Sequence, residues 1–322
     1  MNHHAPFRVV HGWPILPEGF VFGQVTGVGV DSHEHVFVFH RADHAGETKD
    51  GPIEPPVVMC FDGLTGALLD SWGAKMFRVP HGLRVDQRDN IWLTDVGLHQ
   101  VFQFSHEGTL RLSLGAAGTP GWDDRHFYKP TDVAVAPDGS IYVSGGYGNR
   151  RIAKFSPQGR FLGEWGRSGD QPGEFNEVHN LVLDRAGRVY VADRTNRRIQ
   201  VFTGEGGFLA EWKNEVLGCP WGLAYGPDDS LYVVEGGDLA SPRPRARISR
   251  LDLEGKILEQ WSSFGNYDGQ LFCGHDLTVG KSGTVYVGEV KHGMRVQKFS
   301  RCGEEFQFLP RRNEGGTGYR RG

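Results

Sequence analysis

The chain has 322 residues, with 35 basic and 39 acidic side chains and a formal net charge of −4. This length allows one large all-β unit or two ordinary domains, and the acidic balance argues against a nucleic-acid-binding or membrane-surface protein. Glycine is the outlier, because 47 of 322 residues is about twice its usual share. This excess predicts many turns between many short strands.

The N-terminus and the cysteines bear on where the protein acts. The first residues, MNHHAPFRVV, lack the charged and apolar regions of a signal peptide, and no apolar run is long enough to span a bilayer. Cys60, Cys219, Cys273 and Cys302 form no CxxC pair, which is typical of a reducing compartment. We expect a cytoplasmic protein with free thiols and no membrane or nucleic-acid partner.

One unit recurs six times along the chain, at intervals of 42 to 55 residues. It starts as TGVGVD at Thr26, HGLRVD at His81, TDVAVAPDG at Thr131, HNLVLDRAG at His179, WGLAYGPDD at Trp221 and HDLTVGKSG at His275. A turn and a β-rich strand follow, as in RVYVADR, then a third strand such as RRIQVF and a fourth such as GRFLGEWG. Four antiparallel strands in each such repeat indicate a propeller blade.

The sequence therefore predicts an all-β fold, a six-bladed β-propeller with four antiparallel strands per blade, as a single domain over residues 1–310. The N-terminal FRVVHGW is expected to supply the missing outer strand of the last blade. The Gly- and Arg-rich tail, residues 311–322, is expected to be disordered.

The repeat register predicts which residues face the central channel, because the first strand of each blade lines it. Equivalent positions at the strand starts are Thr26, His81, Thr131, His179, Trp221 and His275, so histidine occupies alternate blades. Three neutral imidazoles with an open fourth position are the ligand set of a catalytic zinc. The alternative is that each histidine is a separate polar side chain, hydrogen-bonded near the channel mouth. The alternate-blade spacing favours the metal site.

A second ring, at the end of the second strands, carries arginine only in blades one and four, at Arg41 and Arg194. Two guanidiniums facing one channel suit a substrate with a carboxylate. The alternative is a solvated turn in which the arginine pairs with the preceding aspartate. Tyr147, in GGYGN, lies near the same rim and could act as an acid or base, although an exposed turn tyrosine often has no role.

Several motifs between residues 23 and 299 resemble a known family: GQVTGVGVD, PHGL, WLTDVGLHQVF, GYGNRRI, ADRTNRRIQ and GHD. The repeat is similar to the NHL class of β-propellers. The finer pattern resembles peptidyl-α-hydroxyglycine α-amidating lyase, the second enzyme of peptide C-terminal amidation.

The resemblance implies a zinc-dependent lyase that splits an N-acyl-α-hydroxyglycine-like carbinolamide into a primary amide and glyoxylate. His81, His179 and His275 would bind zinc, and Arg41, Tyr147 and Arg194 would line the substrate site, with Tyr147 as the base. A structural calcium would be held by the Asp276 side chain and by the carbonyls of Val28 and Leu83. The substrate would be a small molecule or peptide with a carboxylate.

The chain departs from the family pattern at three places. Cys273 replaces a methionine of the substrate site; lying two residues before His275, it is expected to face the same side and to contact metal or substrate. Where the animal enzymes pair cysteines, this chain has Tyr128 with Gly148 and Tyr190 with Val201, and His179 follows Val178 where the family has proline.

Two other functions remain open from the sequence. The first is a metal-dependent hydrolase acting on a lactone or ester with the same fold; such enzymes tend to hold calcium with carboxylate and Asn ligands, so the three histidines argue against it. The second is a non-enzymatic NHL interaction module, which usually sits beside other domains and often carries a basic face.

Overall fold

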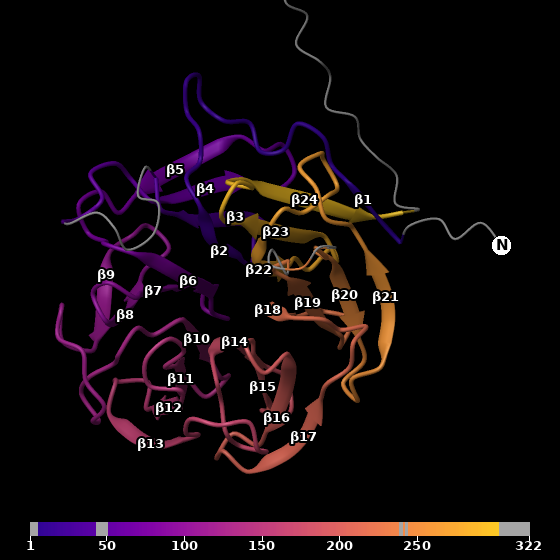
Figure 1. The fold of residues 1–322 in the computed structure, drawn as a ribbon. Helices are drawn as coiled ribbons and strands as arrows, with labels where there is room; N and C mark the ends of the chain where they lie inside the picture. The colour runs from indigo at the N-terminus through magenta and orange to yellow at the C-terminus, as the bar shows by residue number, and fades with distance from the viewer. Residues whose placement is uncertain (1–5, 43–50, 238–240, 242–243, 303–322) are drawn as a thin grey trace, which may run out of the picture.

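The structure, a computed structural model, describes residues 6–42, 51–237, 241 and 244–302. Six four-stranded antiparallel sheets surround one centre (Figure 1), which confirms the predicted six-bladed propeller. The predicted tail, residues 311–322, lies outside the described residues. No helix in the described ranges could cross a membrane.

Each of the first five blades is built from four strands that follow one another in the chain, and the sixth takes its outer strand from the N-terminus. In order, the blades are β2 (Val25–Val30), β3 (His35–His40), β4 (Val58–Asp62) and β5 (Leu68–Trp72); β6 (Pro80–Val85), β7 (Ile91–Asp95), β8 (Gln100–Phe104) and β9 (Leu110–Leu114); β10 (Asp132–Val135), β11 (Ile141–Ser144), β12 (Ile152–Phe155) and β13 (Phe161–Trp165); β14 (Val178–Leu183), β15 (Val189–Asp193), β16 (Arg198–Phe202) and β17 (Phe208–Trp212); β18 (Pro220–Tyr225), β19 (Leu231–Glu235), β20 (Ile248–Leu251) and β21 (Ile257–Trp261); and β22 (Gly274–Val279), β23 (Val285–Glu289), β24 (Val296–Arg301) and β1 (Phe7–Val9).

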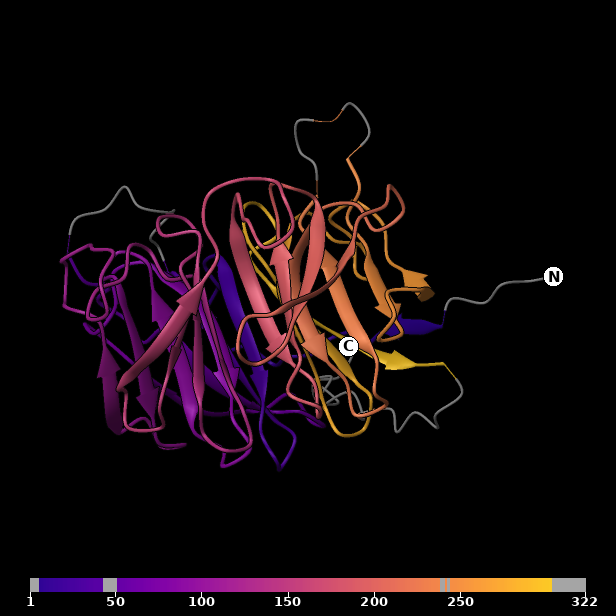
Figure 2. The same cartoon turned by 90° about the horizontal axis from the view of Figure 1, so that it is seen from below.

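The circle of blades is closed by the N-terminal strand. β1 pairs antiparallel with β24, with Phe7 opposite Arg301, as expected from the sequence. Each inner strand contacts the inner strand of the next blade, including β22 with β2. Figure 2 shows the same closure from the side, with β1 beside β24. Closure leaves only short, protected sheet edges around the channel and fixes the inner strands around one axis.

The hydrophobic core lies between the blades. The described residues form six buried clusters, one between each pair of neighbouring blades; Tyr190, Val201 and Leu223 belong to the one between blades four and five. The second strands are buried along most of their length, whereas outer strands such as β13 alternate between partly buried and exposed residues. This gradient follows from each blade packing on two neighbours and exposing its outer edge.

The residues at the two cysteine-pair positions noted above lie side by side within each pair. Tyr190 and Val201 are cross-strand partners. A Cβ added to Gly148 would lie 2.4 Å from the ring of Tyr128, so the aromatic ring fills the space beside the glycine. All four cysteines of the chain are free thiols.

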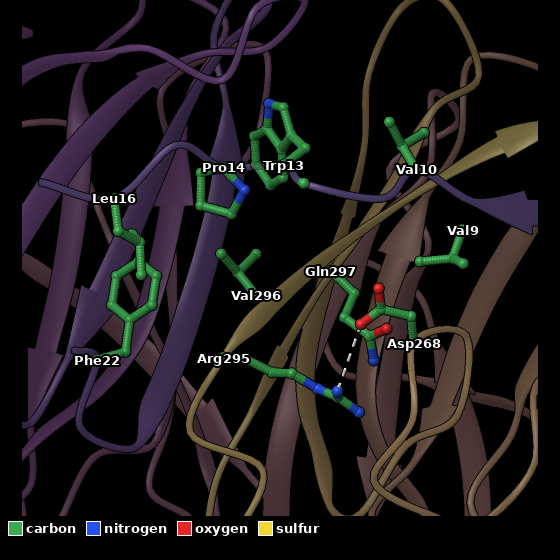
Figure 3. A pocket seen from close by; sticks show the side chains of 11 residues that line it. Val9, Val10, Trp13, Pro14, Leu16, Phe22, Asp268, Arg295, Val296 and Gln297 are labelled. Atoms are coloured by element: carbon green, nitrogen blue, oxygen red, sulfur yellow. Dashed lines mark ion pairs between the residues drawn. The ribbon is translucent and has the colours of Figure 1, made fainter. Parts of the chain in front are cut away.

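A small pocket of about 190 Å³ lies where the N-terminal segment crosses the last blade (Figure 3). Trp13 and Phe22 line one part, and Arg295, which is 3.8 Å from Asp268, lines another. None of its lining residues belongs to the site predicted from the sequence. The pocket thus belongs to the closure of the propeller and is separate from the predicted site.

Candidate active site and metal centre

The three histidines of the channel ring converge on one point of the axis. The ring centroids of His81, His179 and His275 lie 4.6 to 5.0 Å apart, and one nitrogen of each lies within 4.8 Å of the other two. All three side chains are buried. The predicted grouping of His81, His179 and His275 is therefore present in the structure.

β-Bulges direct these side chains toward the axis. In five of the six blades the register between first and second strands shifts at the ring position; in blade three the first strand begins at Asp132, one residue after the ring position. A bulge bends its strand and turns a side chain out of the regular alternation. The histidines of blades two, four and six all sit at such bulges, which places them in the channel.

Each imidazole is oriented by a backbone carbonyl of the next blade. Nδ1 of His81 donates to the carbonyl of Thr131 (2.7 Å), Nδ1 of His179 to that of Trp221 (2.8 Å) and Nδ1 of His275 to that of Thr26 (2.7 Å). These acceptors are the other three residues of the ring. Because the carbonyls fix the proton on Nδ1, the lone pair of each histidine lies on Nε2, the atom that can ligate a metal.

Electrostatics favours neutral imidazoles at this point. Burial lowers the pKa of all three histidines well below the usual 6.5, and the charges of Arg41 or Arg194 lower each of them further. The Nε2 atom of His179 is buried without a hydrogen-bond partner. A buried polar atom without a hydrogen-bond partner is costly unless something binds it, so three converging neutral imidazoles, one of them with such an unpaired nitrogen, fit a divalent metal ion.

Tyr147 lies directly against the histidines. Its hydroxyl donates to Nε2 of His81 at 2.7 Å, and its ring centroid is 5.1 Å from that of His81 and 6.1 Å from that of His179. Burial raises the pKa of Tyr147, while Arg194 and Arg41 lower it in part. The tyrosine predicted for this rim is thus in contact with the histidine group.

The two predicted arginines border the same site. Arg194 stacks on Trp221, with its guanidinium carbon 4.2 Å from the ring centroid, and its Nε donates to Glu177 at 2.9 Å. Arg41 donates from Nε to the carbonyl of Pro80, the residue before His81. Two positive charges therefore lie beside the three imidazoles, an arrangement that could bind a carboxylate.

Glu177 and Trp221 were not predicted as partners of Arg194, yet the register contained the signal. In blades one, two, four and six, the residue just after the second strand donates its amide to the carbonyl of the residue two positions before the ring residue. The amide of Arg41 donates to Gln24 in this way, and the amide of Arg194 donates to Glu177. Glu177 therefore had to lie opposite Arg194. The alternative pairing of Arg194 with Asp193 is absent: Arg194 pairs with Glu177, and Asp193 pairs with Arg198.

Cys273 comes just before β22 and its thiol is buried. Burial raises the pKa of this thiol to about 12, so it stays protonated at neutral pH. The bulge at His275 interrupts the strand alternation, so a spacing of two residues does not place Cys273 on the histidine side. Contact of Cys273 with substrate stays a prediction.

His40 occupies the second ring in blade one and is buried against Phe20 and Phe22. Its Nδ1 accepts the amide of Ala42, and its Nε2 has no partner. Burial lowers the pKa of His40 from 6.5 to about 4. His40 is therefore neutral in the folded protein at neutral pH.

Because the unfolded chain binds a proton at His40 near pH 6.5 and the folded chain only near pH 4, stability is expected to fall as the pH drops between these values. The two pKa values correspond to about 3 kcal/mol for this residue. In urea unfolding at several pH values, His40→Asn, which retains an acceptor, should lose less stability on acidification than the parent protein. Equal pH dependence of the two proteins would contradict this account.

The guanidinium of Arg84 contacts two of the three residues predicted to hold calcium. Nη1 of Arg84 lies 3.1 Å from Oδ1 of Asp276 and 3.5 Å from the carbonyl of Leu83, and Nη2 lies 2.7 Å from Oδ2 of Asp132. Val28 reaches Asp276 through its amide, at 3.2 Å. A calcium ion bound to Asp276 and Leu83 would have to displace this guanidinium, so the residues present do not fit that ion.

A second convergent group, Asp31, His35 and His106, lies beyond the other end of β2. Oδ2 of the buried Asp31 accepts hydrogen bonds from His106 at 2.8 Å and His35 at 3.0 Å, and Oδ1 accepts the amide of His35. Asp86 and Asp184 accept amides in the equivalent turns of blades two and four. Asp31 thus stabilises the turn after β2, and the imidazoles of His35 and His106 already have its carboxylate as a partner.

Comparisons with known proteins agree with this picture. A model of the NHL repeat matches residues 77–104 and 175–202. The chain is 36% identical over 301 residues to peptidyl-glycine alpha-amidating monooxygenase B of Xenopus laevis, covering 86% of this chain and 34% of that protein. It is 34% identical over 321 residues to peptidyl-alpha-hydroxyglycine alpha-amidating lyase 1 of Drosophila melanogaster, covering 90% and 59%.

A streptogramin B lyase structure shares the fold, with a TM-score of 0.60 at 16% identity over 92% of this chain and 98% of that one. The chain spans about a third of the length of the amidating monooxygenases it matches. The sequence matches together show that the chain is an NHL-repeat β-propeller and a relative of the peptidyl-α-hydroxyglycine α-amidating lyases.

Proposed function

We propose that the protein is a zinc-dependent lyase that cleaves an N-acyl-α-hydroxyglycine-like carbinolamide to a primary amide and glyoxylate. The observation that carries the proposal is the convergence of three carbonyl-oriented imidazoles beside one tyrosine and two arginines. Its relatives are named for amidation or for the amidating lyase step. No other arrangement in the described chain combines a metal-ligating set with carboxylate-binding groups.

Zinc bound to His81, His179 and His275 would supply a Lewis acid that lowers the pKa of the substrate's α-hydroxyl. The protein's own contribution is to hold Nε2 of each imidazole unprotonated and pointed at one place, through the three carbonyl bonds. Burial keeps water away from these donors and strengthens the local electrostatics.

Arg41 and Arg194 are proposed to bind the substrate carboxylate that leaves in glyoxylate. Glu177 engages Nε and Nη2 of Arg194 and the indole of Trp221 supports its face, so the guanidinium is held in a fixed orientation. Nη1 is the guanidinium nitrogen that Glu177 does not engage. A pre-oriented guanidinium loses little conformational entropy on binding.

Tyr147 is proposed to accept the proton of the α-hydroxyl and to pass it to the amide nitrogen. The O–H bond breaks, a C=O bond forms, the C–N bond breaks and an N–H bond forms, so the reaction needs no other reactant. Binding of zinc by Nε2 of His81 would release the hydroxyl of Tyr147, which lies 2.7 Å from that nitrogen, and the freed hydroxyl would be within reach of a substrate oxygen bound next to the histidines. Arg194 and Arg41 favour the phenolate that this step requires.

The test is to incubate the purified protein with N-benzoyl-α-hydroxyglycine and to measure glyoxylate, benzamide and bound metal. We expect about one zinc per channel site and equal amounts of the two products. Absence of both transition metal and products would favour an interaction module instead. Hydrolysis of a lactone or ester without glyoxylate release would favour the hydrolase alternative.

Replacing Arg194 with lysine is expected to raise KM about 10- to 100-fold, because a charge-assisted, bidentate contact contributes about 1.5–3 kcal/mol. kcat should change less, since lysine still carries the charge. Arg185→Lys, in an exposed pair with Asp229, is the matched control. Steady-state kinetics on the same substrate measure both constants, and an unchanged KM in Arg194→Lys would exclude the carboxylate role.

A further inference from the structure

We propose that Arg84 is a built-in cation that takes the place of a structural metal ion under the histidine site, so that the propeller needs no calcium. The inference concerns the stability of the channel and goes beyond the proposed reaction. It depends on the geometry of one buried polar cluster on the channel axis.

The guanidinium of Arg84 is surrounded by oxygen atoms from four blades. Nη1 contacts both carboxylate oxygens of Asp276, at 3.1 and 3.3 Å, and the carbonyl of Leu83; Nη2 contacts Asp132 at 2.7 Å and the carbonyl of Leu223 at 3.3 Å. Two carboxylates and two carbonyls converging on one point form the mixed oxygen set that calcium accepts. In this chain the positive charge at that point belongs to a side chain.

The oxygen atoms are themselves held in place. Asp276 accepts the amide of Val28 at 3.2 Å and the side-chain amide of Asn180 at 3.2 Å, and Asp132 accepts the amide of Leu181 at 3.1 Å. Asp132 and Asp276 are 1% and 2% exposed. Buried carboxylates of this kind require a positive partner, and Arg84 is the cation that contacts both.

The inner strands leave room for this cluster. Blades one, two and five have glycine at the position after the ring residue, where blades three and six have Asp132 and Asp276. A Cβ on Gly82 would lie 2.6 Å from the carbonyl of Thr131 and 2.9 Å from Asp132. Thr131 also accepts the hydrogen bond of His81, so the cluster supports the layer that orients the histidines.

Calcium titrations of the metal-stripped protein test the proposal by thermal unfolding and by calorimetry. The parent protein should bind no calcium and its Tm should not move. Arg84→Ala should have a lower Tm and should regain about 5 °C on adding calcium, but not magnesium, because the freed oxygen set would bind the larger ion. Arg84→Lys, which retains a positive charge, should respond less than Arg84→Ala.

Stoichiometric calcium binding by the parent protein, with a rise in its Tm, would overturn the proposal. So would an Arg84→Ala protein that folds and ignores calcium, because Asp132 and Asp276 would then not form a cation site. Should Arg84→Ala not fold, the parent titration alone still decides. None of these measurements uses lyase turnover, so failure of this inference is distinguishable from failure of the proposed function.

Discussion

His179→Ala is expected to abolish lyase turnover, with a loss of at least about 10³-fold in kcat/KM, because metal catalysis supplies several kcal/mol of the barrier reduction. Nε2 of His179 is buried without a hydrogen-bond partner, and its ring lies 5.0 and 4.6 Å from the other two histidines. Two imidazoles do not complete a zinc site, so bound zinc should fall together with activity. Metal analysis and glyoxylate release on the same preparation check both.

A second substitution separates the loss of the ligand from a loss of structure. His179→Asn can still donate to the carbonyl of Trp221, which His179 bonds at 2.8 Å, but it offers no atom in place of Nε2. It should fold like the parent and lose zinc like the alanine variant. His106→Ala, from the Asp31 group at the other end of β2, is the control that should retain channel zinc and turnover. An active, zinc-loaded His179→Asn protein would rule out the three-histidine site.

The grouping of these histidines could be predicted because the fold repeats. Once the six units were aligned, equivalent positions had to form a ring, and the choice of His81, His179 and His275 needed no knowledge of side-chain contacts. The bulges and the carbonyl acceptors could not be predicted the same way. They depend on how each inner strand pairs with its own blade and packs on the next, which local sequence patterns do not encode.

Arg84 marks the limit of the sequence argument. As the fourth residue of HGLRVD it reads as a polar residue near the end of a strand, and the resemblance directed attention to Asp276, Val28 and Leu83. Its partner Asp132 lies 48 residues away and Asp276 lies 192 residues away. Only the closure of the propeller brings these charges together. That Arg84 takes the place of a metal ion between Asp132 and Asp276 can therefore be inferred only from the three-dimensional structure.

Tyr147→Phe is expected to lower kcat by about 10²- to 10⁴-fold, the usual contribution of a positioned acid or base, and to leave zinc content and KM close to the parent values. The phenol touches Nε2 of His81 but is not needed to orient it, because Nδ1 is held by Thr131 at 2.7 Å. The expected pattern is therefore a loss confined to the chemical step, opposite to that of Arg194→Lys.

Burial raises the pKa of Tyr147, so the phenol is protonated when substrate is absent and the rate should rise with pH as the base form becomes available. The variant should lose that rising limb of the kcat profile as well as the rate. Tyr225→Phe, which removes an exposed hydroxyl bonded to Asp229, should change neither. If Tyr147→Phe kept both the rate and the pH profile, another group would have to transfer the proton. This result would contradict the proposed role of Tyr147 but not the histidine site.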